Sequence, residues 1–261
     1  MKPKLVGILQ VRLNSSRLPD KALVDIQGRT ALEVQLARLD ACPELDQIVI
    51  ATTVNPRDDR LEQLAAKLGR PCFRGSEEDV LDRFYQAARQ FEAGHICRLT
   101  GDCPLVDPKM VGRLARHYLA LQPDIVYVNG GPTYPEGSTG CEFFSFAALE
   151  RSWQEAEDPV EREHVTQYIR RRPGEFPAGR LAHDPDLGRF RFTMDEPQDL
   201  EVIRLIIREL GFGPEVGVPQ ICEFLREHPE VDKINNWIIR NEGLLRSRMK
   251  AAGKAHSAKS G

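Results

Sequence analysis

Short apolar segments alternate with longer amphipathic segments through much of this sequence. The apolar segments predicted as strands are 4–10, 46–51, 71–74, 95–99 and 124–128. Between them, apolar residues recur at the spacing of a helix, as in the series Leu61, Leu64, Ala65 and Leu68. A second series of this kind consists of Leu200, Ile203, Ile207 and Leu210. Because crossover connections join such strands, the sequence predicts an α/β fold with a mostly parallel central sheet flanked by helices.

The later part of the chain, about 130–195, has a less regular pattern. Extended segments are predicted near 139–144, 178–182 and 189–194, and we expect antiparallel strands among them, which would make the sheet mixed. With 261 residues, 41% of them hydrophobic, the chain can bury one full core, and we predict a single domain at 1–243. The segment 244–261 is basic and contains no acidic residue, so we predict that it forms a disordered tail.

Composition excludes several classes of function. The formal net charge of −3 gives the whole protein no attraction for nucleic acid or for an anionic membrane. No apolar run approaches the roughly 20 residues of a membrane-spanning helix. The six cysteines form no C-x-x-C pair, which argues against a thiolate zinc site and is typical of reduced thiols. We therefore expect a cytoplasmic protein with no nucleic-acid or membrane partner.

The loop that follows the first predicted strand is rich in cations and hydroxyls. It contains Arg12, Ser15, Ser16, Arg17 and Lys21. Guanidinium groups match phosphate oxygens, lysine adds a mobile point charge, and exposed backbone N–H groups complete an anion site. The loop therefore indicates phosphate binding, with a solvated basic turn as the alternative.

Ligands of a parallel sheet bind beyond the carboxyl ends of its strands, where polar residues are frequent in this chain. Asp102 follows the strand at 95–99, and Asp195 follows the extended segment at 189–194. Two carboxylates together with phosphate oxygens are a suitable site for Mg²⁺. The alternatives are that Asp102 is a turn residue and that Asp195 caps the last long helix. Asp107, which precedes Pro108, is predicted to cap the next helix.

Glu142 and His164 are weaker candidates for a site. Glu142 precedes Phe143 and Phe144, which is typical of a strand that enters the core, and a role at an acceptor site is the alternative. A lone histidine on a helix, such as His164, is more often a packing residue than a substrate contact.

Several motifs occur in a fixed order along the chain. They are Gln10-Val11-Arg12 with Ser16-Arg17-Leu18-Pro19 and Lys21, Ala51-Thr52-Thr53, Arg74-Gly75-Ser76 with Asp79, Leu99-Thr100-Gly101-Asp102-Cys103-Pro104, Arg162-Glu163-His164-Val165-Thr166, and Met194-Asp195-Glu196-Pro197. In this order they resemble the cytidylyltransferases that make CMP-activated acidic sugars. The resemblance extends from Lys4 to about Gly243 and is strongest to the SpsF branch of spore-coat polysaccharide biosynthesis, which is related to CMP-Kdo synthetase and CMP-sialic acid synthetase.

The resemblance implies a single nucleotidyltransferase domain of the Rossmann-like GT-A type. In such an enzyme an acceptor oxygen attacks the α-phosphorus of CTP and pyrophosphate leaves, with Mg²⁺ as the cofactor. The partners would be CTP and a sugar acceptor for surface polysaccharide or glycan synthesis, and a homodimer is left open.

The same resemblance implies roles for individual residues. Arg12, Lys21 and Asp102 would be catalytic, and Asp102 and Asp195 would hold the metal. Glu142 and His164 would bind the acceptor. The nucleotide would be bound by Arg12, Ser15, Ser16, Arg17, Lys21, Thr52, Gly75, Ser76 and Asp79.

The sequence departs from the family pattern at two places. Asp20 stands where the family has glycine, and we predict that its carboxylate points away from the phosphates, because an acid at that position would repel them. The segment 136–141 also differs from the acidic stretch that precedes the family glutamate.

Other functions keep the same fold. A nucleotidyltransferase for a sugar phosphate or a cofactor phosphate is one, and a glycosyltransferase that uses a sugar nucleotide is another. The glycosyltransferase is disfavoured because Gly101-Asp102-Cys103 has only one carboxylate where an Asp-x-Asp motif is typical. A non-catalytic nucleotide-binding protein ranks last, because both the cations and Asp102 are present.

Overall fold

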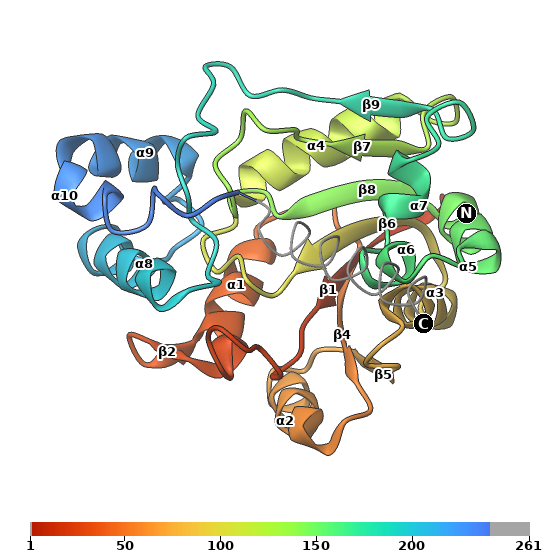
Figure 1. Ribbon diagram of the computed structural model, residues 1–261, viewed down its shortest axis with the longest axis horizontal. Coiled ribbons are helices and arrows are strands. Elements are labelled where there is room, and N and C mark those ends of the chain that lie inside the picture. Colours follow the sequence, from red (N-terminus) through yellow and green to blue (C-terminus); the bar gives the residue numbers. More distant parts are fainter. Residues whose placement is uncertain (1, 241–261) are drawn as a thin grey trace, which may run out of the picture.

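In the computed structural model, which describes residues 2–240, seven strands form one sheet in the order β5-β4-β1-β6-β8-β7-β9 (Figure 1). The strands of this sheet are β1 (Lys4–Gln10), β4 (Gln47–Thr53), β5 (Cys72–Gly75), β6 (Ala93–Thr100), β7 (Tyr127–Asn129), β8 (Cys141–Ser145) and β9 (Ala178–Arg180). A small hairpin is formed by β2 (Asp25–Ile26) and β3 (Arg29–Thr30). The tail predicted at 244–261 lies outside the described residues.

The sheet is mixed, as the sequence predicts. Strands β5, β4, β1 and β6 pair in parallel, whereas β8 runs antiparallel to both β6 and β7. Gln10 at the end of β1 pairs with Ala51 of β4 and with Thr100 of β6. The parallel strands therefore end side by side, and the loops that follow them meet at one edge of the sheet.

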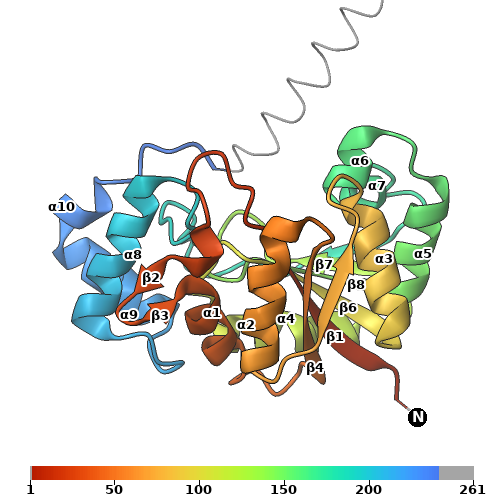
Figure 2. The same cartoon turned by 90° about the horizontal axis from the view of Figure 1, so that it is seen from below.

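Helices cover both faces of the sheet (Figure 2). One face is covered by α1 (Ala31–Leu39), α2 (Asp59–Lys67) and α4 (Pro108–Ala120). The other face is covered by α3 (Val80–Gln90) and α5 (Phe146–Glu155), and the short helices α6 (Pro159–Glu163) and α7 (Gln167–Arg170) follow α5. Leu9 and Leu99 pack on the α1 side, whereas Ile8 and Ile96 pack on the α3 side. This alternation is expected of a strand that is buried on both faces.

A further hydrophobic core joins the last helices to α1. These helices are α8 (Pro197–Leu210), α9 (Val218–Glu227) and α10 (Pro229–Asp232), which lie at the left of Figure 1. Arg38 of α1 is fully buried and donates to the backbone carbonyls of Val106, Phe212, Gly213 and Val216. This guanidinium fastens α1 to the segment between α8 and α9.

The predicted cap of α4 is confirmed. Asp107 accepts hydrogen bonds from the backbone N–H groups of Lys109 and Met110, and Pro108 occupies the first helical position. Its second carboxylate oxygen accepts from the N–H of Val218 at 2.8 Å. Asp107 therefore also fixes the start of α9.

The strand predicted near 189–194 is wrong. This segment is extended, but it contacts a loop instead of a sheet strand, through a single bridge between Arg191 and Glu136. Its alternate side chains Phe190, Phe192 and Met194 are buried, which explains the strand-like pattern. The N–H of Met194 donates to the carbonyl of Asp102 at 2.7 Å, so the segment still brings Asp195 to the edge of the sheet.

All six cysteines are free thiols. Among residues 2–240, no helix combines the length and the apolar character needed to cross a membrane.

Candidate active site

Four charged side chains from distant parts of the chain meet at the carboxyl edge of the sheet. Lys21 begins the 3₁₀ helix η1 (Lys21–Leu23), Asp102 follows β6, and Asp195 precedes α8. The Lys21 Nζ lies 2.8 Å from Asp195 Oδ1 and 3.6 Å from Asp102 Oδ2. Arg17 Nη2 lies 3.4 Å from Asp195 Oδ1. The structure therefore brings together the basic loop and both predicted metal ligands.

This cluster is charged at neutral pH. Burial acts to raise the pKa of Asp102, but the nearby Lys21 ammonium lowers it below its usual value. Burial acts to lower the pKa of Lys21, but Asp102 and Asp195 together raise it. Each partner thus stabilises the ionised form of the other.

Asp195 is not the cap of α8. The N-cap residue is Glu196, and Asp199 accepts hydrogen bonds from the backbone N–H groups of both Asp195 and Glu196, each at 2.9 Å. The carboxylate of Asp195 faces Lys21 instead. Asp102 likewise contacts Lys21 and accepts a hydrogen bond from the Cys103 thiol at 3.2 Å.

The two aspartates fit a magnesium ion. Their oxygens are hard ligands, and both face a point that an ammonium group already occupies, so the site favours a cation. Within the described part of the chain no three His, Cys, Asp or Glu residues are grouped as a complete metal site. An ion at Asp102 and Asp195 would therefore need further oxygens, such as those of a triphosphate.

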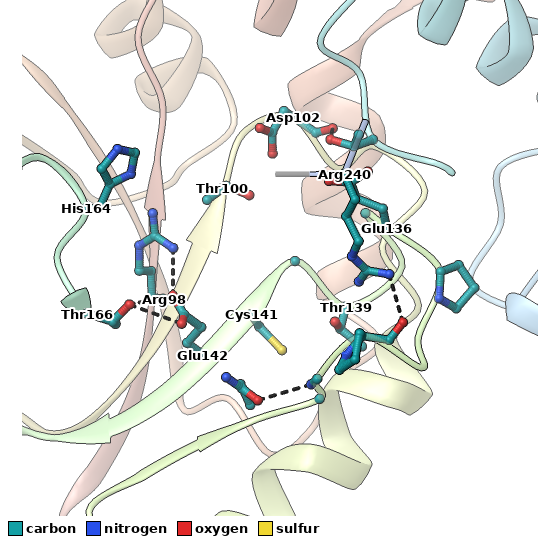
Figure 3. A pocket seen from close by; sticks show the side chains of 18 of the residues that line it. Arg98, Thr100, Asp102, Glu136, Thr139, Cys141, Glu142, His164, Thr166 and Arg240 are labelled. Carbon is teal, nitrogen blue, oxygen red and sulfur yellow. Dashed lines mark hydrogen bonds and ion pairs between the residues drawn. The ribbon is translucent and has the colours of Figure 1, made fainter. Parts of the chain in front are cut away.

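A cavity of about 520 Å³ extends from this cluster along the antiparallel half of the sheet (Figure 3). Its lining includes Asp102 and Asp195 as well as Glu142 and His164. It joins the predicted metal ligands to the predicted acceptor residues.

Glu142 on β8 faces this cavity and is held by several donors. Its carboxylate accepts from Arg98 Nη1 at 2.8 Å, from Thr166 Oγ1 at 3.0 Å and from the Tyr127 hydroxyl. Figure 3 shows Arg98 and Thr166 pointing toward it. Although burial acts to raise the pKa of Glu142, Arg98 and then Arg170 lower it. Glu142 is therefore an ionised residue of the pocket, whereas its neighbours Phe143 and Phe144 form the core.

His164 lies at the end of α6 and also lines the cavity. Its side chain is 22% exposed, and its Nε2 lies 3.8 Å from Glu163 Oε2. His164 is thus partly buried and borders the cavity, so its role as a packing residue or as a substrate contact stays a prediction.

The sequence did not identify the cations that lie near Glu142 in the cavity. Arg98 pairs with Glu142 across β6 and β8, Glu142 pairs with Asn129 of β7, and Asn129 pairs with Arg180 of β9. These four residues form one row across the sheet and line the cavity. Arg98 lies between the buried residues Cys97 and Leu99 of an apolar strand, and a charged residue in such a strand is a sequence signal for a functional site. The sequence does not show, however, which strand would pair beside it.

The remaining residues of the basic loop lie outside this cavity. Arg12 and Ser16 are exposed, and Ser15 is partly exposed. The Ser15 hydroxyl accepts from the N–H of Leu18 at 3.5 Å. These three side chains are therefore accessible to a ligand, but only Arg17 of the loop reaches the cavity lining.

The predicted residues after β5 have structural contacts. The Ser76 hydroxyl accepts from the N–H of Asp79, and Asp79 caps α3 and binds Arg162 at 2.5 Å. A Cβ added at Gly75 would lie 2.8 Å from Cε1 of Phe73 and 3.0 Å from Cγ of the buried Arg83, so a larger residue would force these side chains to shift. These contacts set the shape of the turn.

Thr52 is fully buried on β4. Its hydroxyl has no hydrogen-bond partner among residues 2–240. A nucleotide contact at Thr52 therefore stays a prediction.

Asp20 pairs with two arginines of the neighbouring segment, and its orientation relative to bound phosphates stays a prediction. Its carboxylate binds Arg57 and Arg60, each at 2.8 Å, and the hydrogen bond from Arg57 is the main cause of its lowered pKa. Its backbone has φ of 53°, a left-handed conformation that favours glycine and tolerates aspartate. This conformation explains why glycine would suit the same position in relatives.

Comparison with known proteins identifies relatives along most of the chain. A family profile described as cytidylyltransferase matches residues 6–209. The chain is 34% identical to an uncharacterised protein of Methanocaldococcus jannaschii, over 89% of this chain and 95% of that protein. It is 31% identical to the spore coat polysaccharide biosynthesis protein SpsF of Bacillus subtilis, over 87% of this chain and 95% of SpsF.

Solved structures agree with this result. A cytidylyltransferase from Leptospira borgpetersenii superimposes with a TM-score of 0.84 and 29% identity, covering 88% of this chain and 97% of that one. A CMP:2-keto-3-deoxy-manno-octonic acid synthetase complexed with CTP shares the fold, with a TM-score of 0.63 and 20% identity over 79% of this chain and 99% of the other.

Proposed function

The chain belongs to the cytidylyltransferase family and is a nucleotidyltransferase, and we propose that it transfers CMP from CTP to an acidic or polar sugar. Pyrophosphate would be released, and the product would serve surface polysaccharide or glycan biosynthesis. The observation that carries the proposal is the position of Lys21 between Asp102 and Asp195, at one end of a cavity that reaches Glu142.

On the nucleotide side, Arg12, Ser15, Ser16, Arg17 and Lys21 would hold the triphosphate. Phosphoryl transfer depends mainly on positioning and on neutralising charge, and cations beside the leaving pyrophosphate do both. Thr52 and the turn of Gly75, Ser76 and Asp79 would border the base and ribose.

Asp102 and Asp195 would hold Mg²⁺ together with the triphosphate. When bound there, the ion would neutralise charge on the phosphate oxygens. Lys21, which is the counter-ion of the two carboxylates in this structure, would then be available to donate to a phosphate.

On the acceptor side, Glu142 and His164 would contact the sugar. The lowered pKa of Glu142 makes it a weak base, so we assign it to orienting a hydroxyl group of the acceptor. The Arg98 guanidinium and the Thr166 hydroxyl hold this carboxylate in place.

A sugar phosphate is the second candidate acceptor. Arg98, Arg170 and Arg180 line this end of the cavity, where Glu142 is the facing acid, and arginine binds phosphate as readily as carboxylate. An anionic acceptor of either kind fits this charge better than a neutral sugar.

A screen of pyrophosphate release tests the proposal. The four common nucleoside triphosphates would each be combined with Mg²⁺ and with a panel of acidic sugars, neutral sugars and sugar phosphates. We expect release only with CTP and an anionic acceptor. Release with sugar phosphates but not with acidic sugars would favour the second candidate, and release with a different nucleotide would contradict the assignment of CTP. The free thiols are compatible with a cytoplasmic location, which is part of the proposal.

A further inference from the structure

Arg191 contacts three carboxylates from separate parts of the candidate site. It lies in the extended segment before α8 and is 6% exposed. Its guanidinium binds Asp199 through Nε and Nη2, both at 2.8 Å, and binds Glu136 through Nη1 at 2.5 Å. Nη2 also lies 3.8 Å from Asp195 Oδ2. No sequence motif pointed to Arg191, so this arrangement is visible only in the fold.

Asp199 connects Arg191 to the backbone at Asp195. Asp199 is fully buried, and its Oδ2 accepts from the N–H groups of Asp195 and Glu196 while its Oδ1 accepts from Asn235. The planar guanidinium fork and this carboxylate form two parallel hydrogen bonds, which fix orientation more strongly than a point charge can. The position of Asp195 therefore depends on the Arg191–Asp199 pair.

The contact with Glu136 reaches the wall of the acceptor cavity. Glu136 lines the cavity, and its backbone forms two hydrogen bonds with the segment beside it, one to Phe190 and one from Phe192. A side chain at the next residue, Gly137, would lie 2.4 Å from the backbone nitrogen of Thr193. The cavity loop and the segment that carries Arg191 are thus packed in direct backbone contact.

We propose that Arg191 is a positioning residue. It holds Asp195 in the position that binds the metal ion, and through Glu136 it links that position to the wall of the acceptor cavity. The inference rests on the proposed function, because it assigns Asp195 to Mg²⁺. Arg191 contacts all three acids, so its loss removes the guanidinium that holds Asp199 against the backbone N–H groups of Asp195 and Glu196. Removing an outer partner of a metal ligand typically weakens metal binding by about 10- to 100-fold.

The test measures how much Mg²⁺ strengthens CTP binding, by calorimetry with Mg²⁺ and with EDTA. Arg191→Lys keeps the positive charge but loses the planar fork, and we expect it to lower the Mg²⁺-dependent gain about tenfold or more. Its CTP affinity in EDTA should stay close to that of the wild type. Arg191→Met should lose at least as much of the gain.

Two further variants separate positioning from folding. Arg38→Lys is the matched control, because Arg38 is equally buried but donates to backbone carbonyls. It should lower the melting temperature and leave the Mg²⁺-dependent gain unchanged. Glu136→Gln keeps the Asp199 contacts, so it should preserve the gain and change only the concentration of acceptor needed for half-maximal pyrophosphate release.

The outcomes are distinct. An unchanged gain in Arg191→Lys, with a loss of melting temperature like that of Arg38→Lys, would overturn this inference alone and leave a structural ion pair. A wild type that does not bind CTP would overturn the proposed function and this inference with it.

Discussion

At the scale of single residues, Lys21 contacts carboxylates, whereas the composition of its loop suggests phosphate. The loop composition indicates phosphate binding, yet in this structure the Lys21 ammonium lies between Asp102 and Asp195. Each of the three side chains is 25% exposed or less, so these charges interact more strongly than surface ion pairs do. The same ammonium can therefore hold the two carboxylates together and also serve a nucleotide.

Lys21→Met should separate these two roles. We expect kcat/KM for CTP to fall by roughly 10² or more, which is the scale of losing one preorganised charge contact. The melting temperature should also fall in EDTA, because Asp102 and Asp195 lose the ammonium group that lies between them, and Mg²⁺ should restore it. Lys109→Met, at an exposed lysine of α4, is the control. A variant that keeps full activity would refute the phosphate role of the loop.

Asp20→Gly should leave CTP affinity nearly unchanged at both low and high salt. The carboxylate is bound to Arg57 and Arg60, and glycine accepts the φ of 53°. Since the two arginines are about half exposed, loss of the pairs should lower the free energy of unfolding by about 1 kcal/mol or less. Calorimetry at two salt concentrations and urea unfolding measure these effects. A gain in affinity that disappears with salt would mean that Asp20 opposes the triphosphate after all.

At the scale of elements, the extended segment at 190–195 joins the two halves of the site. It carries Arg191 and Asp195, donates from Met194 to Asp102, and packs against the loop at 132–138. The sequence predicted its extended shape from alternating apolar residues, but not its partner. Periodicity reports which residues are buried and cannot say whether a strand or a loop lies beside them.

Gly137→Ala should disturb this junction. Gly137 has φ of +85°, and an added Cβ would lie 2.4 Å from the Thr193 nitrogen, so the loop and the segment must separate. Gly211→Ala is the matched control, because Gly211 has φ of +81° and open space around it. Both variants should be destabilised by about 1–3 kcal/mol from backbone strain. Only Gly137→Ala should lose more stability than this and also change the use of the acceptor. Thermal unfolding and pyrophosphate release measure these two effects. Equal behaviour of the two variants would contradict the packing of the loop against the segment.

At the scale of the whole molecule, the part that could be predicted from the sequence is the parallel half of the sheet. Strands β1, β4, β5 and β6, the helices between them and the meeting of Lys21 with Asp102 follow from periodicity and from the rule that ligands bind beyond the strand ends. The half that contains Glu142 was less predictable, because Arg98, Glu142 and Arg180 lie in one row across β6, β8, β7 and β9, whose pairing is set by long-range packing. The family resemblance predicted Glu142 and His164 as site residues, and the structure shows which residues lie beside them.

Stability should fall at acidic pH. The folded-state pKa values of Asp102, Glu142 and Asp199 are lowered, mainly by Lys21, Arg98 and Arg191 acting against burial. A carboxyl with a lowered folded pKa contributes stability above its unfolded pKa of about 4 and loses it as the pH falls through the folded pKa.

Urea unfolding should therefore show a decreasing free energy of unfolding below about pH 4. The raised pKa of Lys21 has the opposite sign and gives a loss only as the pH rises past its usual value of 10.5. Asp199→Asn should reduce the slope of the free energy of unfolding against pH in the acidic range. An unchanged slope would show that the Arg191–Asp199 pair does not contribute to this pH dependence.

Calorimetric titration of the wild type with CTP, UTP, ATP and GTP in the presence of Mg²⁺ tests the central claim most directly. It needs no knowledge of the acceptor, and it addresses the nucleotide on which the proposed reaction depends. The account predicts that CTP binds at least about tenfold more tightly than the others, equivalent to about 1.4 kcal/mol, and that EDTA weakens this binding. Equal affinity for all four nucleotides, or no binding of CTP, would contradict it.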